Sequence, residues 1–268
     1  MVTAGQKALY DTFGFLFVKD LFSPAEVSEI VEDAERLWEQ ERGRPDFQVA
    51  DDGSQHTGPF VELSPRLFKL VDDERIYPAV DRLIGPDMVW TGSEGNITGY
   101  SAARWHPDRR NHVLGDLDYP RLKVMLYLDE VRADSGALRV IPGSHRNPLH
   151  DGLYAMLDAA GWEPIPEAEN EADMPFGVAG DRMPCYIVES SPGDVLFFNQ
   201  CLFHAAYHAS SGRRYIALKF AGNPATDQNI DALRRGSEKA FMPHESLLTS
   251  ENARVRALVQ PLAEIGPA

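Results

Sequence analysis

From Met88 onward the chain breaks into short runs rich in β-branched, aromatic and aliphatic residues, separated by Gly, Pro and Asp. Runs of this length and spacing are typical of a β-sandwich or barrel. The clearest are DMVWTGSEGNITGY, RLKVMLYLDEV, GALRVIPGSH, GDVLFFNQCLFHAAY and RRYIALKFAG. We therefore expect a mainly β core over about residues 87–222, within a single domain that spans residues 1–268.

Helical patterns flank this core. In SPAEVSEIVEDAERLWEQERG, Ser23 can cap a helix, Pro24 suits its first position, Glu26 completes a capping box and Gly43 supplies a stop. Its apolar residues follow the helical period, which predicts one face packed on a large surface, most plausibly a sheet. They are Val27, Ile30, Val31, Ala34, Leu37 and Trp38.

Further helices are expected on both sides of the core. The segment SPRLFKLVDDERIYPAVDRLIG repeats the Ser-Pro start at Ser64 and Pro65, and it is predicted to break near Pro78. With it, the helical amino-terminal part covers about residues 1–86. A helical carboxyl-terminal part over residues 223–268 is predicted from DQNIDALRRGSEKAF and SENARVRALVQPLAEIG.

Composition limits the kinds of partner. A chain of 268 residues, 43% of them hydrophobic, can bury a large core. Its formal net charge of −15 argues against nucleic acid or anionic membranes as partners and favours a small-molecule substrate, although the same charge also serves solubility. No run is long enough to span a membrane, and the amino end lacks the order of a secretion signal. We expect a cytoplasmic monomer or homodimer with Cys185 and Cys201 as reduced thiols.

The stretch WHPDRRNH contains two metal-ligand types, His106 and Asp108, separated by one residue. On an extended strand such side chains point to the same face and can share one ion. A third ligand is sought among the remaining histidines. His204 ends the run GDVLFFNQCLFH, whose buried strand would carry it into the interior, and His208, with the same strand parity, is the competitor.

Two imidazoles and one carboxylate leave coordination positions open, as in non-haem Fe(II) oxygenases. Zinc enzymes use the same ligand types, so ligand identity alone leaves a hydrolase or isomerase open. Nine residues beyond His204, Arg213 and Arg214 open a strand, where a guanidinium could bind a carboxylate through two hydrogen bonds.

Four blocks in order resemble the phytanoyl-CoA dioxygenase (PhyH) family of Fe(II)- and 2-oxoglutarate-dependent oxygenases. They are FGFLFVKDLFSPAEV, WHPD, LYLDEVRADSGALRVIPGSH and GDVLFFNQCLFHAAYHASSGRRYIALKF, and they cover most of residues 13–222. The resemblance implies a double-stranded β-helix (jelly-roll, cupin-like) core with flanking helices. It implies Fe(II) and O2 with 2-oxoglutarate as cosubstrate, and oxidation of an unactivated C–H bond by hydroxylation, desaturation or cyclisation.

Carried over position by position, the resemblance places the iron ligands and catalytic centre at His106, Asp108 and His204. It places the arginine that binds the distal carboxylate of 2-oxoglutarate at Arg213, because in the family an aromatic-type residue follows seven positions later, here Phe220. Residue alternation along the strand does not decide between Arg213 and Arg214. Because Asp108 is present, the resemblance implies a hydroxylase type of enzyme and not a halogenase.

The chain departs from the family at the cosubstrate. Many members have Gly-Ser after the distal histidine, whereas here Ala205 and Ala206 follow His204, and Met125 stands where a tryptophan is frequent. The remaining contacts to 2-oxoglutarate must come from nearby strands. The candidates are Met125 itself, Asn96, Thr98, Tyr100 and Tyr127.

A long segment over about residues 149–187 has no sustained period and is predicted to form a lid over the metal. Candidate substrate contacts in and near it are Arg109, Trp162, Met174, Phe176 and Met183. The best-fitting substrate is a small secondary-metabolite intermediate. The alternatives are a Zn- or Mn-dependent cupin-type hydrolase or isomerase, which would give Arg213 no role, and a non-catalytic cupin-like binding module.

Overall fold

Two antiparallel sheets face each other at the centre of the structure, a computed structural model that describes residues 2–48, 50–99, 103–108, 117–161, 174–208 and 212–267. One sheet has the strand order β1-β8-β5-β10-β3-β2 and the other β4-β9-β6-β7. The strands are β1 (Phe15–Val18), β2 (Gln55–Thr57), β3 (Met88–Ile97), β4 (Ala103–His106), β5 (Arg121–Tyr127), β6 (Leu138–Val140), β7 (Tyr186–Val188), β8 (Val195–Asn199), β9 (His204–Ala206) and β10 (Arg214–Gly222).

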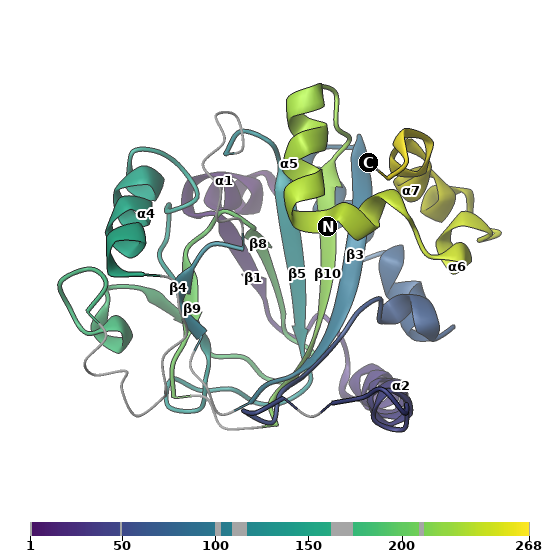
Figure 1. Cartoon of the computed structure of the whole chain (residues 1–268), viewed down its shortest axis with the longest axis horizontal. Helices are drawn as coiled ribbons and strands as arrows, with labels where there is room; N and C mark the ends of the chain where they lie inside the picture. The colour runs from purple at the N-terminus through teal and green to yellow at the C-terminus, as the bar shows by residue number, and fades with distance from the viewer. Residues whose placement is uncertain are drawn as a thin grey trace.

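Among the described strands from β3 to β10, the chain passes back and forth between the two sheets, and only β6 and β7 are consecutive strands of one sheet. This is the winding of a double-stranded β-helix. The expected fold class, a mainly β jelly-roll core with flanking helices, is confirmed (Figure 1).

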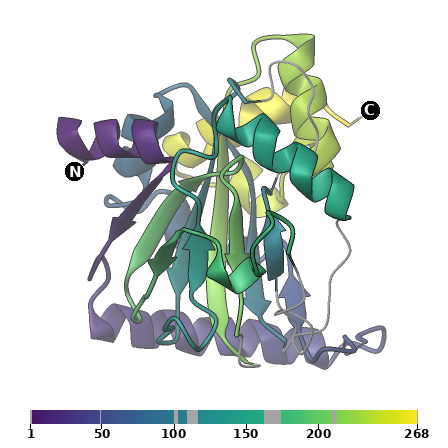
Figure 2. The same cartoon turned by 90° about the vertical axis from the view of Figure 1, so that its left-hand side faces the viewer.

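Apolar side chains pack in three layers around the two sheets. Residues such as Met125, Leu196, Val140 and Val188 fill the space between the sheets. The outer face of the six-stranded sheet packs against α2 (Pro24–Arg42), α3 (Tyr77–Ile84), α6 (Glu245–Leu248) and α7 (Ala253–Ile265), and the outer face of the four-stranded sheet packs against α4 (Leu149–Ala160). Figures 1 and 2 show these helices on opposite sides of the strands.

Helix α2 forms where its local signals predict. The Glu26 amide donates to Ser23 Oγ at 3.3 Å and the Ser23 amide donates to Glu26 Oε2 at 2.8 Å, so the capping box is complete. Pro24 stands in the first turn and Gly43 is the C-cap. Of the predicted apolar face, Val27, Ile30, Ala34, Leu37 and Trp38 are buried against the six-stranded sheet, as expected, and Val31 lies at its margin.

The second helical segment is interrupted close to Pro78, as expected. A 3₁₀ turn (Leu67–Val71) is followed by α3, and Pro78 lies in the first turn of α3. A proline fits there because the first helical amides need no partner within the helix. A capping box between Thr3 and Gln6 begins an unanticipated helix, α1 (Ala4–Phe13).

The predicted carboxyl-terminal helices are present as α5 (Asp227–Ser237) and α7, with α6 and a 3₁₀ turn (Glu238–Phe241) between them. Proline at 261 lies inside α7. Within the described ranges, no helix is both long and apolar enough to cross a membrane.

The α2 capping box generates a stability prediction. Replacing Ser23 by Ala removes the acceptor for the Glu26 amide and should lower the free energy of unfolding by about 1 kcal/mol. Ser28→Ala, an exposed change in the second turn of the same helix, serves as the matched control and should cause no loss. Urea unfolding of both variants measures the difference, and equal losses would contradict a capping role.

Candidate metal centre

The candidate metal centre depends on the pairing of β4 with β9. These strands are antiparallel, and their register sets His106 directly opposite His204. The two imidazole rings lie side by side, with their centroids 4.4 Å apart. On its other edge β9 pairs with β6, where Val140 is opposite His204 and completes the floor of the site.

Asp108 completes the cluster two residues after His106. One of its carboxylate oxygens, Oδ1, lies 3.6 Å from His204 Nε2. A ligand atom from each of His106, Asp108 and His204 can be chosen so that all three lie within 4.8 Å of one another. Two imidazole nitrogens and one carboxylate oxygen this close can bind one divalent ion and leave further coordination positions open.

Backbone carbonyls orient both imidazoles. His106 Nδ1 lies 2.6 Å from the carbonyl oxygen of Arg104, and His204 Nδ1 lies 2.9 Å from that of Leu202. Assigning the Nδ1 proton to these hydrogen bonds makes Nε2 the ring nitrogen that can coordinate a metal ion in each histidine. Each acceptor lies two residues before its histidine, a second-sphere detail that the sequence pattern alone did not identify.

The charges of the cluster suit a cation. Burial, reinforced by the neighbouring His106, lowers the pKa of His204 to about 3, so its imidazole is neutral at pH 7 and able to coordinate. Burial alone would raise the pKa of Asp108, but the Lys123 ammonium and the two histidines outweigh burial and hold that pKa well below its usual range. Asp108 is therefore an anion at all physiological pH values.

Lys123 is a site residue that sequence reasoning missed. It lies on β5, its Nζ is 3.3 Å from Asp108, and its side chain is 11% exposed. Burial would lower its pKa, but Asp108 and Glu94 raise that pKa above its usual range. The available signal was residue alternation, because Lys123 shares a strand face with Met125, which was a candidate.

The candidate cosubstrate residues gather on the inner face of the six-stranded sheet. Tyr215 on β10 pairs with Asn96 on one side and Tyr127 on the other, and Met125 is opposite Ala217. Thr98 adjoins them, since its amide donates to the Arg213 carbonyl at 2.9 Å. Asn96, Met125 and Tyr127 are buried, whereas Thr98 and Tyr215 are partly exposed.

Several polar atoms of this group have no hydrogen-bond partner among the described residues: Asn96 Nδ2, Thr98 Oγ1, Tyr127 Oη, and Nε and Nη1 of Arg213. Leaving such atoms unpaired costs about 1–3 kcal/mol each, and more for a charged group. A concentration of unpaired donors within one small region indicates a place for a polar, anionic ligand.

The two adjacent arginines have different surroundings. The Arg213 residue is 8% exposed, and its guanidinium lies over the Tyr215 ring at 5.8 Å from the centroid. Arg214 points to the other face, where it binds Asp129 at 2.5 Å and Glu35 at 2.6 Å. Arg214 is thus committed to a structural ion-pair network, and Arg213 is the guanidinium directed into the interior.

The structure corrects how His204 is carried. The strand over residues 195–199 belongs to the six-stranded sheet and does not continue to His204, which begins β9 in the other sheet after a turn closed by the Leu202 amide on the Asn199 carbonyl. His208 lies beyond β9 with a positive φ of 59°. Its Nε2 lies 3.3 Å from Asp181 and outside the cluster.

The lid over residues 149–187 stays a prediction, because residues 162–173 lie outside the described residues, whereas several of the predicted substrate contacts are placed away from the cluster. Residues 149–160 form α4, which is buried through Leu153 and Leu157 against the outer face of the four-stranded sheet. Phe176 and Met183 pack on the same outer face with Trp105, so they point away from the metal ligands because Trp105 and His106 alternate along β4. Met174 is 57% exposed. Tyr100, Arg109 and Trp162 lie outside the described residues.

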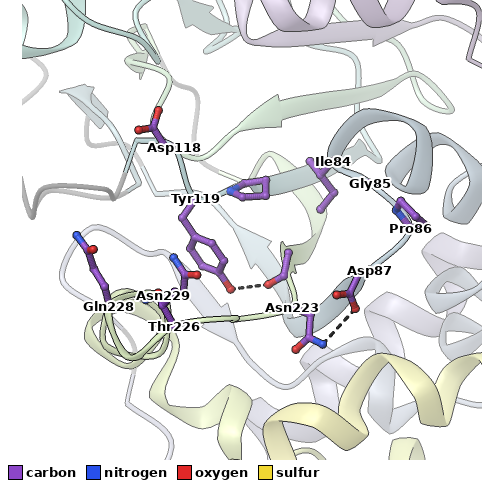
Figure 3. Close-up of a pocket in the computed structure, with 12 residues that line it drawn as sticks. Ile84, Gly85, Pro86, Asp87, Asp118, Tyr119, Asn223, Thr226, Gln228 and Asn229 are labelled. Atoms are coloured by element: carbon purple, nitrogen blue, oxygen red, sulfur yellow. Dashed lines mark hydrogen bonds between the residues drawn. The ribbon is translucent and has the colours of Figure 1, made fainter.

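A separate cleft of about 470 Å³ lies between the loop before β3, the start of β5 and the start of α5 (Figure 3). Two pairs of polar groups in its lining bind each other. The Asn223 side chain donates to Asp87 at 3.1 Å, and the Tyr119 hydroxyl donates to the Gly222 carbonyl. This mutual pairing contrasts with the unpaired donors around Arg213, so the cleft is not our candidate site.

The fold and the cluster together define a double-stranded β-helix protein with a candidate two-histidine, one-carboxylate metal site. Residues 10–216 match the family described as phytanoyl-CoA dioxygenase (PhyH). The chain belongs to this family, which confirms the resemblance seen in the sequence.

Individual relatives are consistent with this assignment. The chain is 31% identical over 157 residues to the ectoine dioxygenase of Streptomyces coelicolor, covering 55% of this chain and 52% of that protein. It is 25% identical over 239 residues to the ectoine dioxygenase of Sphingopyxis alaskensis, covering 79% and 78%. The matched region spans about half the length of the curated relatives with the strongest matches. Crystalline HygX from Streptomyces hygroscopicus, with nickel and 2-oxoglutarate bound, shares the fold with a TM-score of 0.61 at 19% identity, over 82% of this chain and 86% of HygX.

The cluster generates a prediction about metal binding. His204→Ala removes one of three ligands and should weaken Fe(II) binding by about 100-fold or more, since even loss of a second-sphere partner costs 10–100-fold. His208→Ala, four residues further along, is the matched control and should leave affinity nearly unchanged. Anaerobic Fe(II) titration measures both. Full binding by His204→Ala with loss in His208→Ala would exclude our choice of third ligand.

Proposed function

We propose that the chain is an Fe(II)- and 2-oxoglutarate-dependent dioxygenase that oxidises an unactivated C–H bond of a small organic molecule. The observation that carries this proposal is the presence, in one barrel interior, of the His106–Asp108–His204 cluster and the buried Arg213, whose Nε and Nη1 have no hydrogen-bond partner among the described residues. A Zn or Mn hydrolase or isomerase would use the metal cluster but would leave the buried Arg213 unexplained. A binding module would need neither the open metal positions nor the guanidinium.

His106, Asp108 and His204 would hold Fe(II), and Arg213 would bind the distal carboxylate of 2-oxoglutarate. When bound, iron and 2-oxoglutarate together supply from O2 an oxidant able to attack unactivated C–H bonds, with release of CO2 and succinate. The residues of the chain position these components and surround them. The carbonyls of Arg104 and Leu202 fix the imidazoles, and the apolar residues between the sheets limit access of water.

The cosubstrate contacts differ in type from those expected of many family members. Asn96 Nδ2, Thr98 Oγ1 and Tyr127 Oη supply donors on the same face as Arg213, and they can replace the hydroxyl missing at Ala206. Burial raises the pKa of Tyr127 to about 12, against the opposing charge of Arg213, so its hydroxyl stays protonated and can donate. Met125 lines this space with an apolar surface.

The carboxylate of Asp108 leaves no room for a halide in its place, so hydroxylation, desaturation or cyclisation is the proposed outcome. The substrate is proposed to be a small organic molecule of secondary metabolism. The site supports the reaction class more strongly than the substrate, because the residues that meet the substrate vary on one fold.

The function is tested by two measurements on the purified protein. Anaerobic addition of Fe(II) and then 2-oxoglutarate should produce a visible charge-transfer band, and admission of O2 with a pooled metabolite library should raise succinate release above the uncoupled background. Zn(II) or Mn(II) should support neither signal. Lack of the band and of succinate under saturating Fe(II) would reject the proposal.

A second prediction separates the two arginines. Arg213→Ala removes a charge-assisted contact to a buried carboxylate and should weaken 2-oxoglutarate binding by roughly 30-fold or more, equivalent to about 2–5 kcal/mol. It should not lower the free energy of unfolding, because it removes a buried charge whose Nε and Nη1 have no hydrogen-bond partner among the described residues. Arg214→Ala should lower the free energy of unfolding and leave 2-oxoglutarate binding nearly unchanged, because it removes the ion-pair partner of Asp129 and Glu35 and does not alter the interior.

Calorimetric titration with 2-oxoglutarate and urea unfolding of both variants provide the comparison. Equal and small losses of 2-oxoglutarate affinity in the two variants would show that neither arginine is the anchor.

A further inference from the structure

Two lysines face each other inside the barrel. Lys123 on β5 and Lys219 on β10 are direct cross-strand partners, and residue alternation turns both toward the metal cluster. Their side chains are 11% and 22% exposed. Like charges directly opposite each other on neighbouring strands are destabilising, and partial burial increases that cost. An unfavourable arrangement beside a candidate active centre calls for a functional explanation.

Each lysine contacts one carboxylate among the described residues. Lys123 Nζ lies 3.3 Å from both oxygens of Asp108, and Lys219 forms an ion pair with Glu94 on β3. The same Glu94 oxygen, Oε1, lies 3.5 Å from His56 Nε2 on β2. An ammonium group carries three N–H donors, so both lysines can donate further hydrogen bonds toward the interior.

The groups around the candidate metal position would carry an excess of positive charge once a divalent metal ion and 2-oxoglutarate are bound. Lys123, Lys219, Arg213 and a divalent metal ion carry five positive charges. Asp108, Glu94 and the two carboxylates of 2-oxoglutarate carry four negative charges, so one positive charge stays uncompensated. His56 can only add to this excess when it is protonated. The chain as a whole has a net charge of −15, so the positive interior is a local feature.

Metal binding would increase the excess of positive charge around Lys123. Asp108 is both the partner of Lys123 and a candidate metal ligand, and a metal ion would draw on the same carboxylate. The Lys123 ammonium then faces a divalent cation on one side and Lys219 on the other. An anionic group bound between the two lysines would relieve both repulsions.

We propose that Lys123 and Lys219 bind an anionic oxygen group of the substrate, so that the oxidised molecule is an organic acid held by its carboxylate or phosphate. This proposal rests on the proposed function and adds the substrate class to it. Lys219 is the specificity-determining residue of the pair, because Lys123 also contacts Asp108. Glu94 orients the Lys219 ammonium through their ion pair.

The contacts argue against a purely structural role for the pair. Two ion pairs on distant strands would stabilise the barrel better, because their ammonium groups would not repel each other. Here Lys123 and Lys219 are direct cross-strand partners. The neighbours of the pair along the same strand faces, Met125 and Ala217, belong to the apolar interior cluster. Apolar residues at positions 123 and 219 would fill this space without any desolvation of charge.

The test uses three probes that share one ring and differ in charge: benzoate, phenyl phosphate and the neutral benzamide. Each is titrated calorimetrically, without oxygen, into protein saturated with Fe(II) and 2-oxoglutarate. At least one anion should bind about tenfold or more tightly than benzamide, the scale of one charge-assisted hydrogen bond. A preference for benzoate would identify a carboxylate as the natural group, and a preference for phenyl phosphate would identify a phosphate.

Variants separate the lysine pair from other sources of anion binding. Lys219→Met should lose the advantage of the anions over benzamide, and Lys219→Arg should keep most of it. The double variant E94Q/K219Q should also lose it, and this variant leaves no unpaired carboxylate behind. Lys239→Met removes the same charge from an exposed position outside the barrel and should behave as wild type.

The charge-transfer band with 2-oxoglutarate reports in every sample whether the loaded site has formed. A normal band together with equal affinities for benzoate, phenyl phosphate and benzamide would overturn the anion proposal and leave the oxygenase assignment intact. Unchanged anion affinity in both Lys219→Met and E94Q/K219Q would overturn it as well. Absence of the band in wild-type protein would reject the oxygenase assignment itself.

Discussion

The pairing of β4 with β9 is the interaction on which the rest of the site depends. This short antiparallel contact sets His106 against His204 and turns both rings to the inner side of the four-stranded sheet. A slip of one residue would send one imidazole to the outer face, where Trp105 and Phe203 pack under α4. The packing of those two aromatic residues therefore protects the register, and so the metal cluster, from the opposite side of the sheet.

The division between the two faces of each sheet explains how a charged site exists inside a stable protein. Helices α2, α3, α6 and α7 bury the outer face of the six-stranded sheet with apolar side chains and supply a core of their own. The inner face is then free to carry Glu94, Lys123, Arg213 and Lys219. Buried charges and unpaired donors are costly, and the large apolar layer outside offsets that cost.

The interior charges form a preorganised set. Lys123 keeps Asp108 ionised. Burial lowers the pKa of Lys219, and the neighbouring Glu94 carboxylate partly opposes that shift. Burial would raise the pKa of Glu94, but His56 and the two lysines lower it to about 2, so Glu94 stays anionic. Arg214 is ion-paired with Asp129 and Glu35, whereas the adjacent Arg213 is the candidate site residue.

The sequence by itself determined the features that local rules control. Ser23 and Glu26 specified the start of α2, the spacing of His106 and Asp108 placed them together, and the ordered blocks identified the family. Long-range pairing decided the rest. Only the tertiary structure placed Lys123 beside Asp108 and paired His208 with Asp181. It also turned Arg213 inward and Arg214 outward, and it packed Phe176 and Met183 on the outer face. The physical reason is that capping and residue alternation act over a few residues, whereas the partner of each side chain across a sheet depends on the register between strands that are distant in the chain.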